Sequence, residues 1–200
     1  KYPSGGGDVL MGSIITRDNA LHMRLKLAHM RLGLGVGMND VELVLRSLPS
    51  TALRYHAQDK TARQLAAALQ RQNAVKQLLH PAFASSPGHA HWQQLCATPE
   101  NPAGAAAGIF SVVFDAPQSQ VDDFCNRLQL FKLGYSWGGH ISLVMPYALD
   151  EMRDLGRGAV LPGCLVRLCI GLEEAADLER DVAQAYGQAF GHAWRGQGVH

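Results

Sequence analysis

The chain has 200 residues and a mass of 21.6 kDa, which is enough to bury one or two hydrophobic cores and excludes a disordered chain. Hydrophobic residues make up 47% of it and charged residues 18%, a composition typical of globular proteins that excludes collagens, coiled coils and low-complexity polymers. The formal net charge of +1 provides no long-range attraction for nucleic acid or an anionic membrane, so we expect neither as a partner.

The cysteines and the hydropathy pattern indicate a cellular compartment. The four cysteines form no C-x-x-C pair and lie among apolar neighbours, which favours a reducing cytoplasm. The longest run of low polarity, residues 105–114, is far shorter than the roughly 20 residues that span a bilayer.

The sequence starts at Lys1 without a methionine, in a tract typical of the middle of a domain, and we expect a fragment of a longer polypeptide.

The first 49 residues are predicted to contain one strand and two helices. Residues 8–16 are expected to form a short buried strand, because turn residues flank their apolar run. An amphipathic, capped helix is expected over residues 18–32, with Gly33 as its stop. A second helix over residues 39–48 is interrupted by Pro49, where we place a domain boundary.

Helices and strands alternate in the rest of the chain. A long helix is predicted from Ser50 to about Asn73, followed later by short helices and a C-terminal amphipathic helix. The pattern predicts an α/β protein in which helices pack on one face of a mostly antiparallel sheet. Strands are expected over residues 75–79, 109–114, 133–136, 141–145 and 164–170.

The helices of this second part have identifiable apolar faces. Ser119 is expected to cap the helix that follows the strand at 109–114. A short helical segment is expected around residues 91–96. The predicted apolar residues are Leu53, Ala57, Thr61, Leu65 and Leu69 in the long helix, Val121, Phe124, Cys125 and Leu128 in the next, and Leu178, Val182 and Tyr186 in the last.

Arg167 is the only charged residue in the predicted strand over residues 164–170. A buried guanidinium without an anion is costly, so a negative group should face it. Two explanations stay open. Either a structural carboxylate such as Glu173, or solvent at a strand end, satisfies it, or it binds a substrate carboxylate through its planar, two-pronged donor set.

Two further segments each allow a structural or a functional explanation. In the segment 135–139, Ser136 and Trp137 precede two glycines, which either let the backbone approach a ligand or form a simple turn. Lys1 stands beside Tyr2 and a glycine-rich loop. It is either a solvated lysine or a nucleophile that forms a Schiff base, which requires desolvation or a nearby positive charge.

Other candidate sites are less well supported by their spacing. His89, His91 and Cys96 lack a fourth ligand at a recognised spacing, so no metal site is predicted. The glycine-spaced loop at residues 33–37 follows a helix rather than a strand, which is the wrong context for a dinucleotide-binding loop. No motif for a serine or cysteine nucleophile accompanies the histidines.

The order of short motifs along nearly all of the chain resembles a known family, the pyridoxal-phosphate-dependent enzymes of cysteine and methionine metabolism that act on cystathionine. Within that family, the chain most resembles the bacterial cystathionine beta-lyases. The motifs are KYPSGGGDVLMG at residues 1–12, Arg46-Ser47-Leu48, His80-Pro81-Ala82, Gly88-His89 with Trp92, YSWGG at 135–139, and LVRLCIGLE at 165–173.

The resemblance implies roles for four residues. Lys1 matches the lysine that binds pyridoxal 5'-phosphate covalently and transfers the α-proton, and Arg167 matches the arginine that binds the substrate α-carboxylate. Ser136 and Trp137 match residues that position the lysine and the carboxylate. Relatives often have glutamate where this chain has Ile141, a position tied to substrate choice.

The resemblance also implies an architecture, a fold-type I PLP-dependent transferase-like fold. Residues 1–49 would end the large cofactor domain, and residues 50–200 would form a smaller C-terminal domain. The implied activity is that of a carbon–sulfur lyase of methionine biosynthesis, which cleaves cystathionine, an amino-acid thioether, by α,β-elimination to homocysteine, pyruvate and ammonia. The implied assembly is a homotetramer, a dimer of dimers with composite active sites.

Two alternatives remain beside this activity. One is the activity of a cystathionine gamma-lyase or gamma-synthase of the same family. The other is a non-catalytic fragment, because family members carry the groups that clamp the cofactor upstream of the lysine, and this sequence does not include them.

Overall fold

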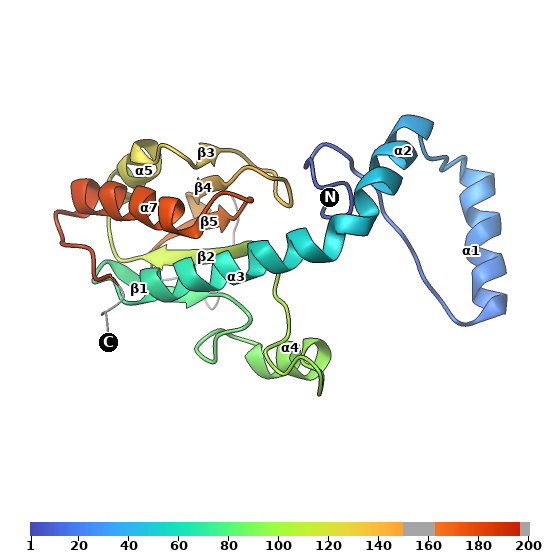
Figure 1. The fold of residues 1–200 in the computed structure, drawn as a ribbon, viewed down its shortest axis with the longest axis horizontal. Helices are drawn as coiled ribbons and strands as arrows, with labels where there is room; N and C mark the ends of the chain where they lie inside the picture. The colour runs from blue at the N-terminus through green and yellow to red at the C-terminus, as the bar shows by residue number, and fades with distance from the viewer. Residues whose placement is uncertain (150–162, 197–200) are drawn as a thin grey trace.

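The structure, a computed structural model, describes residues 1–149 and 163–196. A five-stranded sheet forms the body of the molecule, and helices α1 and α2 extend away from it as an arm (Figure 1). The elements in chain order are α1 (Asn19–Leu32), α2 (Met38–Ser47), the 3-10 turn η1 (Leu48–Ser50), α3 (Thr51–Gln70), β1 (Val75–Leu79), α4 (His89–Cys96), β2 (Ile109–Phe114), α5 (Gln118–Arg127), β3 (Lys132–Leu133), β4 (Leu143–Tyr147), β5 (Cys164–Cys169) and α7 (Ala175–Phe190).

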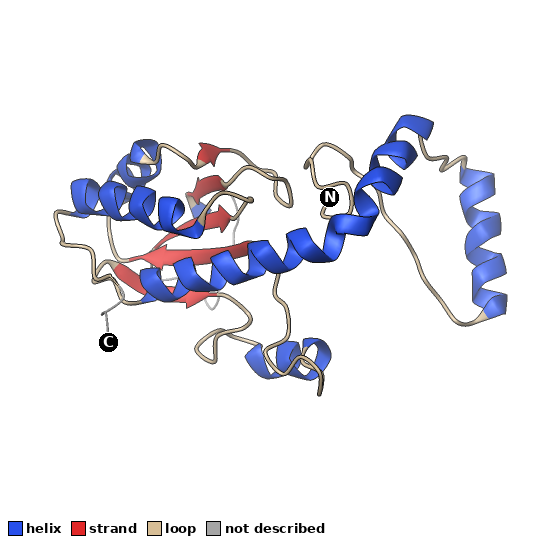
Figure 2. Cartoon of the chain, viewed as in Figure 1, coloured by secondary structure: helices blue, strands red, loops and turns tan. Residues whose placement is uncertain are grey.

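The strands of the sheet are red in Figure 2, and their order is β1-β2-β5-β4-β3. Every neighbouring pair is antiparallel except β3 and β4, which confirms the predicted mostly antiparallel sheet. The strands predicted at 75–79, 109–114 and 164–170 are present, and β4 begins two residues later than predicted. The strand predicted at 133–136 is wrong beyond Leu133, because the chain leaves the sheet and turns at Gly138, where φ is +73°.

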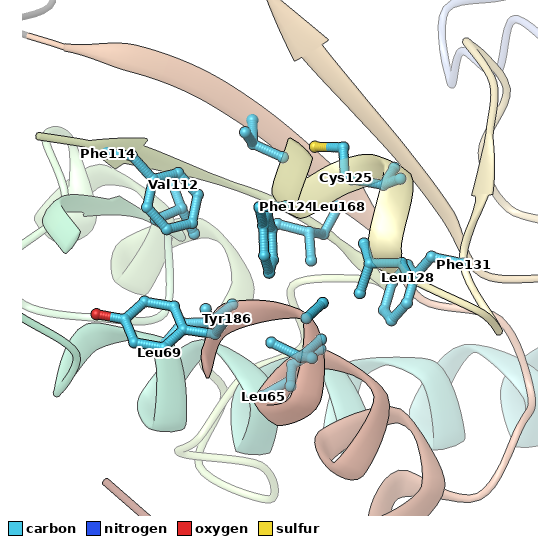
Figure 3. Packing of buried hydrophobic residues seen from close by; sticks show 14 of the residues in the cluster. Leu65, Leu69, Val112, Phe114, Phe124, Cys125, Leu128, Phe131, Leu168 and Tyr186 are labelled. Carbon is cyan, nitrogen blue, oxygen red and sulfur yellow. The ribbon is translucent and has the colours of Figure 1, made fainter. Parts of the chain in front are cut away.

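The core lies between the sheet and helices α3, α5 and α7 (Figure 3). Phe114 stacks on Phe190 with ring centroids 5.2 Å apart, and the buried Tyr186 hydroxyl accepts a hydrogen bond from the Ala74 amide at 2.9 Å. The apolar residues predicted for α5 and α7 are all buried, as expected. The Ser119 cap is wrong, because α5 begins at Gln118, so Ser119 lies inside the helix and the cap position is held by Pro117, with no side-chain hydrogen bond.

Helix α3 buries a different face in its first half than the sequence predicted. Leu65 and Leu69 are buried as expected, but Leu53 is 75% exposed. The buried positions near the start of α3 are instead Gln58 and Asp59. A hydrophobic pattern cannot identify such positions, because these polar side chains are buried by virtue of their hydrogen bonds rather than their hydrophobicity.

The arm confirms the predicted helices but not the predicted strand. The Asp18 carboxylate caps α1 by accepting hydrogen bonds from two backbone amides, and Gly33 ends it with φ at +64°. Residues 8–16 form no strand, and Ile15 is 91% exposed, because no described strand pairs with this segment. The apolar stripe of α1 contacts no core, since none of its residues is buried.

Pro49 lies in η1, between α2 and α3, at the predicted domain boundary. The division into residues 1–49 and 50–200 stays a prediction, and residues 150–162 and 197–200 of the second part lie outside the described residues. No helix within 1–149 and 163–196 has the length and apolarity needed to cross a membrane.

We expect the free energy of unfolding to fall in mild acid because of His80. This side chain is fully buried between Phe83 and Phe110, and its Nε2 has no hydrogen-bond partner among the described residues. Burial, assisted by the charge of Arg63, lowers the pKa of the imidazole from 6.5 to about 4. The unfolded chain therefore binds more protons as the pH falls from 6.5 to 4, and about 3 kcal/mol of stability should be lost over that range.

Urea denaturation of the wild type and of a His80→Asn variant at pH 7.0, 5.5 and 4.5 tests this expectation. Asparagine does not titrate, and its oxygen can replace Nδ1 as the acceptor for the Ala82 amide. The wild type should lose stability relative to the variant as the pH falls. A difference between the two proteins that stays constant with pH would contradict the expectation.

Candidate functional site

The loop of residues 1–7 (the Lys1 loop) brings Lys1 against the loop of residues 134–142 (the Ser136 loop), which lies between β3 and β4. The carbonyl of Lys1 accepts hydrogen bonds from the Ser4 hydroxyl and the Gly5 amide, which folds the first residues into tight turns. The Lys1 Nζ donates a hydrogen bond to Ser136 Oγ at 2.6 Å and lies 4.6 Å from the centroid of the Trp137 ring. Three residues singled out from the sequence are therefore in direct contact.

The glycines after Trp137 allow this contact. A Cβ at Gly138 would lie 3.3 Å from both Lys1 Cβ and the Tyr2 backbone nitrogen, and a Cβ at Gly139 would lie 3.1 Å from the Gly6 carbonyl oxygen. Contacts this short are tighter than nearly all real Cβ contacts. The pair of glycines therefore does more than form a turn, since it lets the Ser136 loop pack closely on the Lys1 loop.

Arg167 lies half-buried in the middle of β5, and the structure shows that Glu173 is not its partner. The Glu173 carboxylate instead accepts hydrogen bonds from the Ser142 amide and hydroxyl, both at 2.7 Å. Within the described part of the chain, Arg167 makes no ion pair, and its one hydrogen bond reaches the Gly134 carbonyl at 3.4 Å. The guanidinium is therefore available to bind an anion from outside the described structure.

Two aromatic rings lie near the Arg167 guanidinium. Its central carbon is 5.8 Å from the Trp137 ring centroid and 5.7 Å from that of Tyr147. Tyr147 was not among the residues that the sequence indicated. Strand pairing brings Tyr147 to the site, because β4 places Met145 opposite Arg167 and Tyr147 two residues further on the same face of the sheet. That pairing is not visible in the sequence.

Two other reactive side chains near the site are unsuited to act as nucleophiles. Burial raises the pKa of Tyr2 to about 12, and its hydroxyl accepts a hydrogen bond from the Gly108 amide. Burial also raises the pKa of the Cys169 thiol, which keeps it protonated. Of these three side chains, the Lys1 amine is the one that contacts Ser136 directly.

These residues could hold a cofactor that carries a carbonyl group together with an amino-acid substrate. Lys1 supplies a primary amine, Ser136 holds that amine by a hydrogen bond, and Arg167 offers a cation with no carboxylate partner in the described structure. Pyridoxal phosphate would be held here through the Lys1 amine. The close packing at Gly138 and Gly139 keeps that amine beside the Ser136 loop.

Of the residues weighed for a metal site, His89 has other contacts. His89 Nδ1 lies 2.8 Å from the Pro81 carbonyl oxygen, and its ring packs against Trp92. Cys96 is exposed at the end of α4. Over residues 1–149 and 163–196, no group of three or more His, Cys, Asp or Glu side chains is arranged to hold a metal ion.

Comparison with known proteins identifies the family of this chain. A family model described as "Cys/Met metabolism PLP-dependent enzyme" matches residues 1–187. The cystathionine beta-lyase of Bordetella avium is 36% identical over 192 residues, which cover 94% of this chain and 46% of that protein. The cystathionine gamma-lyase of Bacillus subtilis is 32% identical, over 92% of this chain and 48% of its own.

A solved structure shows the same fold. The crystal structure of cystathionine gamma-synthase from Xanthomonas oryzae pv. oryzae, in complex with cystathionine, matches with a TM-score of 0.80 and 29% identity. The match covers 96% of this chain and 49% of that one, so the chain spans about half the length of the relatives it matches. The likeness supports the predicted fold-type I architecture.

Proposed function

The chain belongs to the Cys/Met metabolism PLP-dependent enzyme family, and we propose that it supplies the lysine and the carboxylate-binding arginine of a carbon–sulfur lyase that cleaves cystathionine by α,β-elimination. The observation that carries this proposal is the Lys1–Ser136 contact of 2.6 Å beside Arg167, which has no carboxylate partner in the described structure. We further propose a homo-oligomeric, cytoplasmic enzyme, with residues 1–49 belonging to its large domain and residues 50–200 to its small domain.

The residues of this chain bind and orient the substrate and move its protons. Arg167 binds the α-carboxylate through two parallel hydrogen bonds, and the rings of Trp137 and Tyr147 limit how far the guanidinium can rotate. Bound pyridoxal phosphate draws electrons away from the α-carbon. The Lys1 amine accepts the α-proton and returns a proton to the departing sulfur. Ser136 holds that amine in place by a hydrogen bond.

Gamma-lyase and gamma-synthase activities are the second candidate, because relatives with both names match this chain about as extensively as the beta-lyase does. The products separate the candidates. A beta-lyase forms pyruvate from cystathionine and a gamma-lyase forms 2-oxobutyrate, whereas a gamma-synthase joins two substrates to make cystathionine. We expect pyruvate.

Borohydride reduction of the full-length protein, followed by intact mass measurement and peptide mapping, tests the site. We expect a pyridoxyl adduct on the peptide that contains Lys1, because reduction fixes the bond between the amine and the cofactor. A full-length protein that binds pyridoxal phosphate but carries no adduct on Lys1 would refute the assignment. A full-length protein that binds no pyridoxal phosphate would favour the non-catalytic alternative.

A further inference from the structure

The side chain of Arg54, near the start of α3, donates hydrogen bonds to the backbone of the Lys1 loop. Its Nη1 donates to the Tyr2 carbonyl at 2.7 Å, and its Nη2 donates to the Pro3 carbonyl at 3.0 Å. The same guanidinium also donates to the Ser47 carbonyl at 3.0 Å. Within the described residues it makes no ion pair, so its charge strengthens hydrogen bonds to main-chain carbonyls. Two of those carbonyls directly follow Lys1 in the chain.

Gln58, one turn further along α3, holds the facing loop. Its side chain is only 1% exposed, and its Nε2 donates to the Gly139 carbonyl at 2.7 Å and the Ile170 carbonyl at 3.1 Å. Its Oε1 has no hydrogen-bond partner among the described residues, which is a cost for a buried amide. The side chain therefore serves as a double donor that joins the end of the Ser136 loop to the end of the strand that carries Arg167.

We propose that Arg54 and Gln58 are positioning residues that together set the distance between the Lys1 amine and the Ser136 hydroxyl. Residues four apart lie on the same face of a helix, about 6 Å apart along its axis, so one rigid turn of α3 carries both attachments. The Arg54 hydrogen bonds also join residues on the two sides of the predicted domain boundary at residues 49 and 50. A movement of residues 50–200 relative to residues 1–49 would therefore move the Lys1 loop. The proposal rests on the proposed function only in taking Lys1 as the reacting amine.

The rate at which the Lys1 amine reacts with a small reagent tests this positioning, and the test does not require bound cofactor. The full-length protein is freed of any pyridoxal phosphate and treated with formaldehyde and cyanoborohydride, and methylation of the Lys1 peptide is followed by mass spectrometry. In the wild type, the contacts with Ser136 and Trp137 should slow the reaction. Each of Arg54→Ala and Gln58→Met removes at least two hydrogen bonds to main-chain carbonyls. The loss of even one such bond corresponds to about a fivefold change, so each variant should speed methylation at least about fivefold.

Arg63→Ala is the matched control. Arg63 is also on α3 and also donates to main-chain carbonyls, but to Ala103 and Gly104, in a loop that holds none of the proposed site residues. Its loss should leave Lys1 methylation unchanged. Arg54→Lys, which keeps the charge but cannot bond both carbonyls in the same way, should give an intermediate rate and covers the case in which Arg54→Ala does not fold.

Rescue separates positioning from general destabilisation. Millimolar guanidinium should slow Lys1 methylation in Arg54→Ala towards the wild-type rate, and should have no such effect in Gln58→Met. Wild-type methylation rates in the folded Arg54 and Gln58 variants would overturn the proposal, and so would an equal acceleration in Arg63→Ala. Failure of the proposed function would show itself separately, as a protein that binds no pyridoxal phosphate while Lys1 methylation still responds to Arg54 and Gln58.

Discussion

Replacing Lys1 with alanine should lower the rate of pyruvate formation from cystathionine by at least about 10³-fold, because one amine both holds the cofactor and transfers the protons. The fold should survive. Lys1 is half-buried, and its side chain contributes one hydrogen bond to Ser136, a net stabilisation of about 1 kcal/mol. Steady-state kinetics and far-ultraviolet circular dichroism of the full-length variant would measure both effects.

Lys1→Arg is the informative companion variant. Arginine keeps the positive charge and the donor to Ser136, but its guanidinium stays protonated and forms no Schiff base, so this variant should be as inactive as Lys1→Ala. Lys60→Ala, on an exposed position of α3, should retain wild-type activity. More than a tenth of wild-type activity in Lys1→Arg would show that the charge, rather than the nucleophile, matters at this position.

The core and most of the secondary structure could be predicted because they depend on local pattern. The apolar spacing of α5 and α7 and the β-branched run of β2 identify buried faces from the sequence alone. The segment at residues 8–16 has a similar apolar run, yet it forms no strand. A strand is stabilised by its neighbours, and no described strand pairs with this segment.

The site was only partly predictable for a related reason. Their surroundings alone left Lys1 and Arg167 each with a structural and a functional explanation, and only the resemblance to the family implied their roles. The partner of Arg167 could not be predicted, since the sequence allowed Glu173 and only the fold places that carboxylate on Ser142. Arg54 and Gln58 act through main-chain carbonyls, and carbonyls have no signature in a sequence.

Replacing Arg167 with leucine should lower kcat/KM for cystathionine by about 10³-fold, mostly through a higher KM. Two hydrogen bonds between a guanidinium and a carboxylate contribute about 1.5–3 kcal/mol each, which together corresponds to about two to four orders of magnitude in binding. The variant should fold, because no described carboxylate depends on Arg167 and leucine suits the apolar strand β5. Arg167→Lys should lose less, since it keeps the charge without the planar fork.

Inhibitors can show that the lost interaction is with a carboxylate. An amino-acid inhibitor and its carboxamide should differ strongly in affinity for the wild type and bind nearly equally to Arg167→Leu, because only the carboxylate uses the guanidinium. Tyr147→Leu removes a ring that faces Arg167 at 5.7 Å and should weaken carboxylate binding by about threefold, the contribution expected of one exposed cation–π contact. If Arg167→Leu still preferred the carboxylate over the carboxamide, another cation would have to bind it, and the assignment of Arg167 would be wrong.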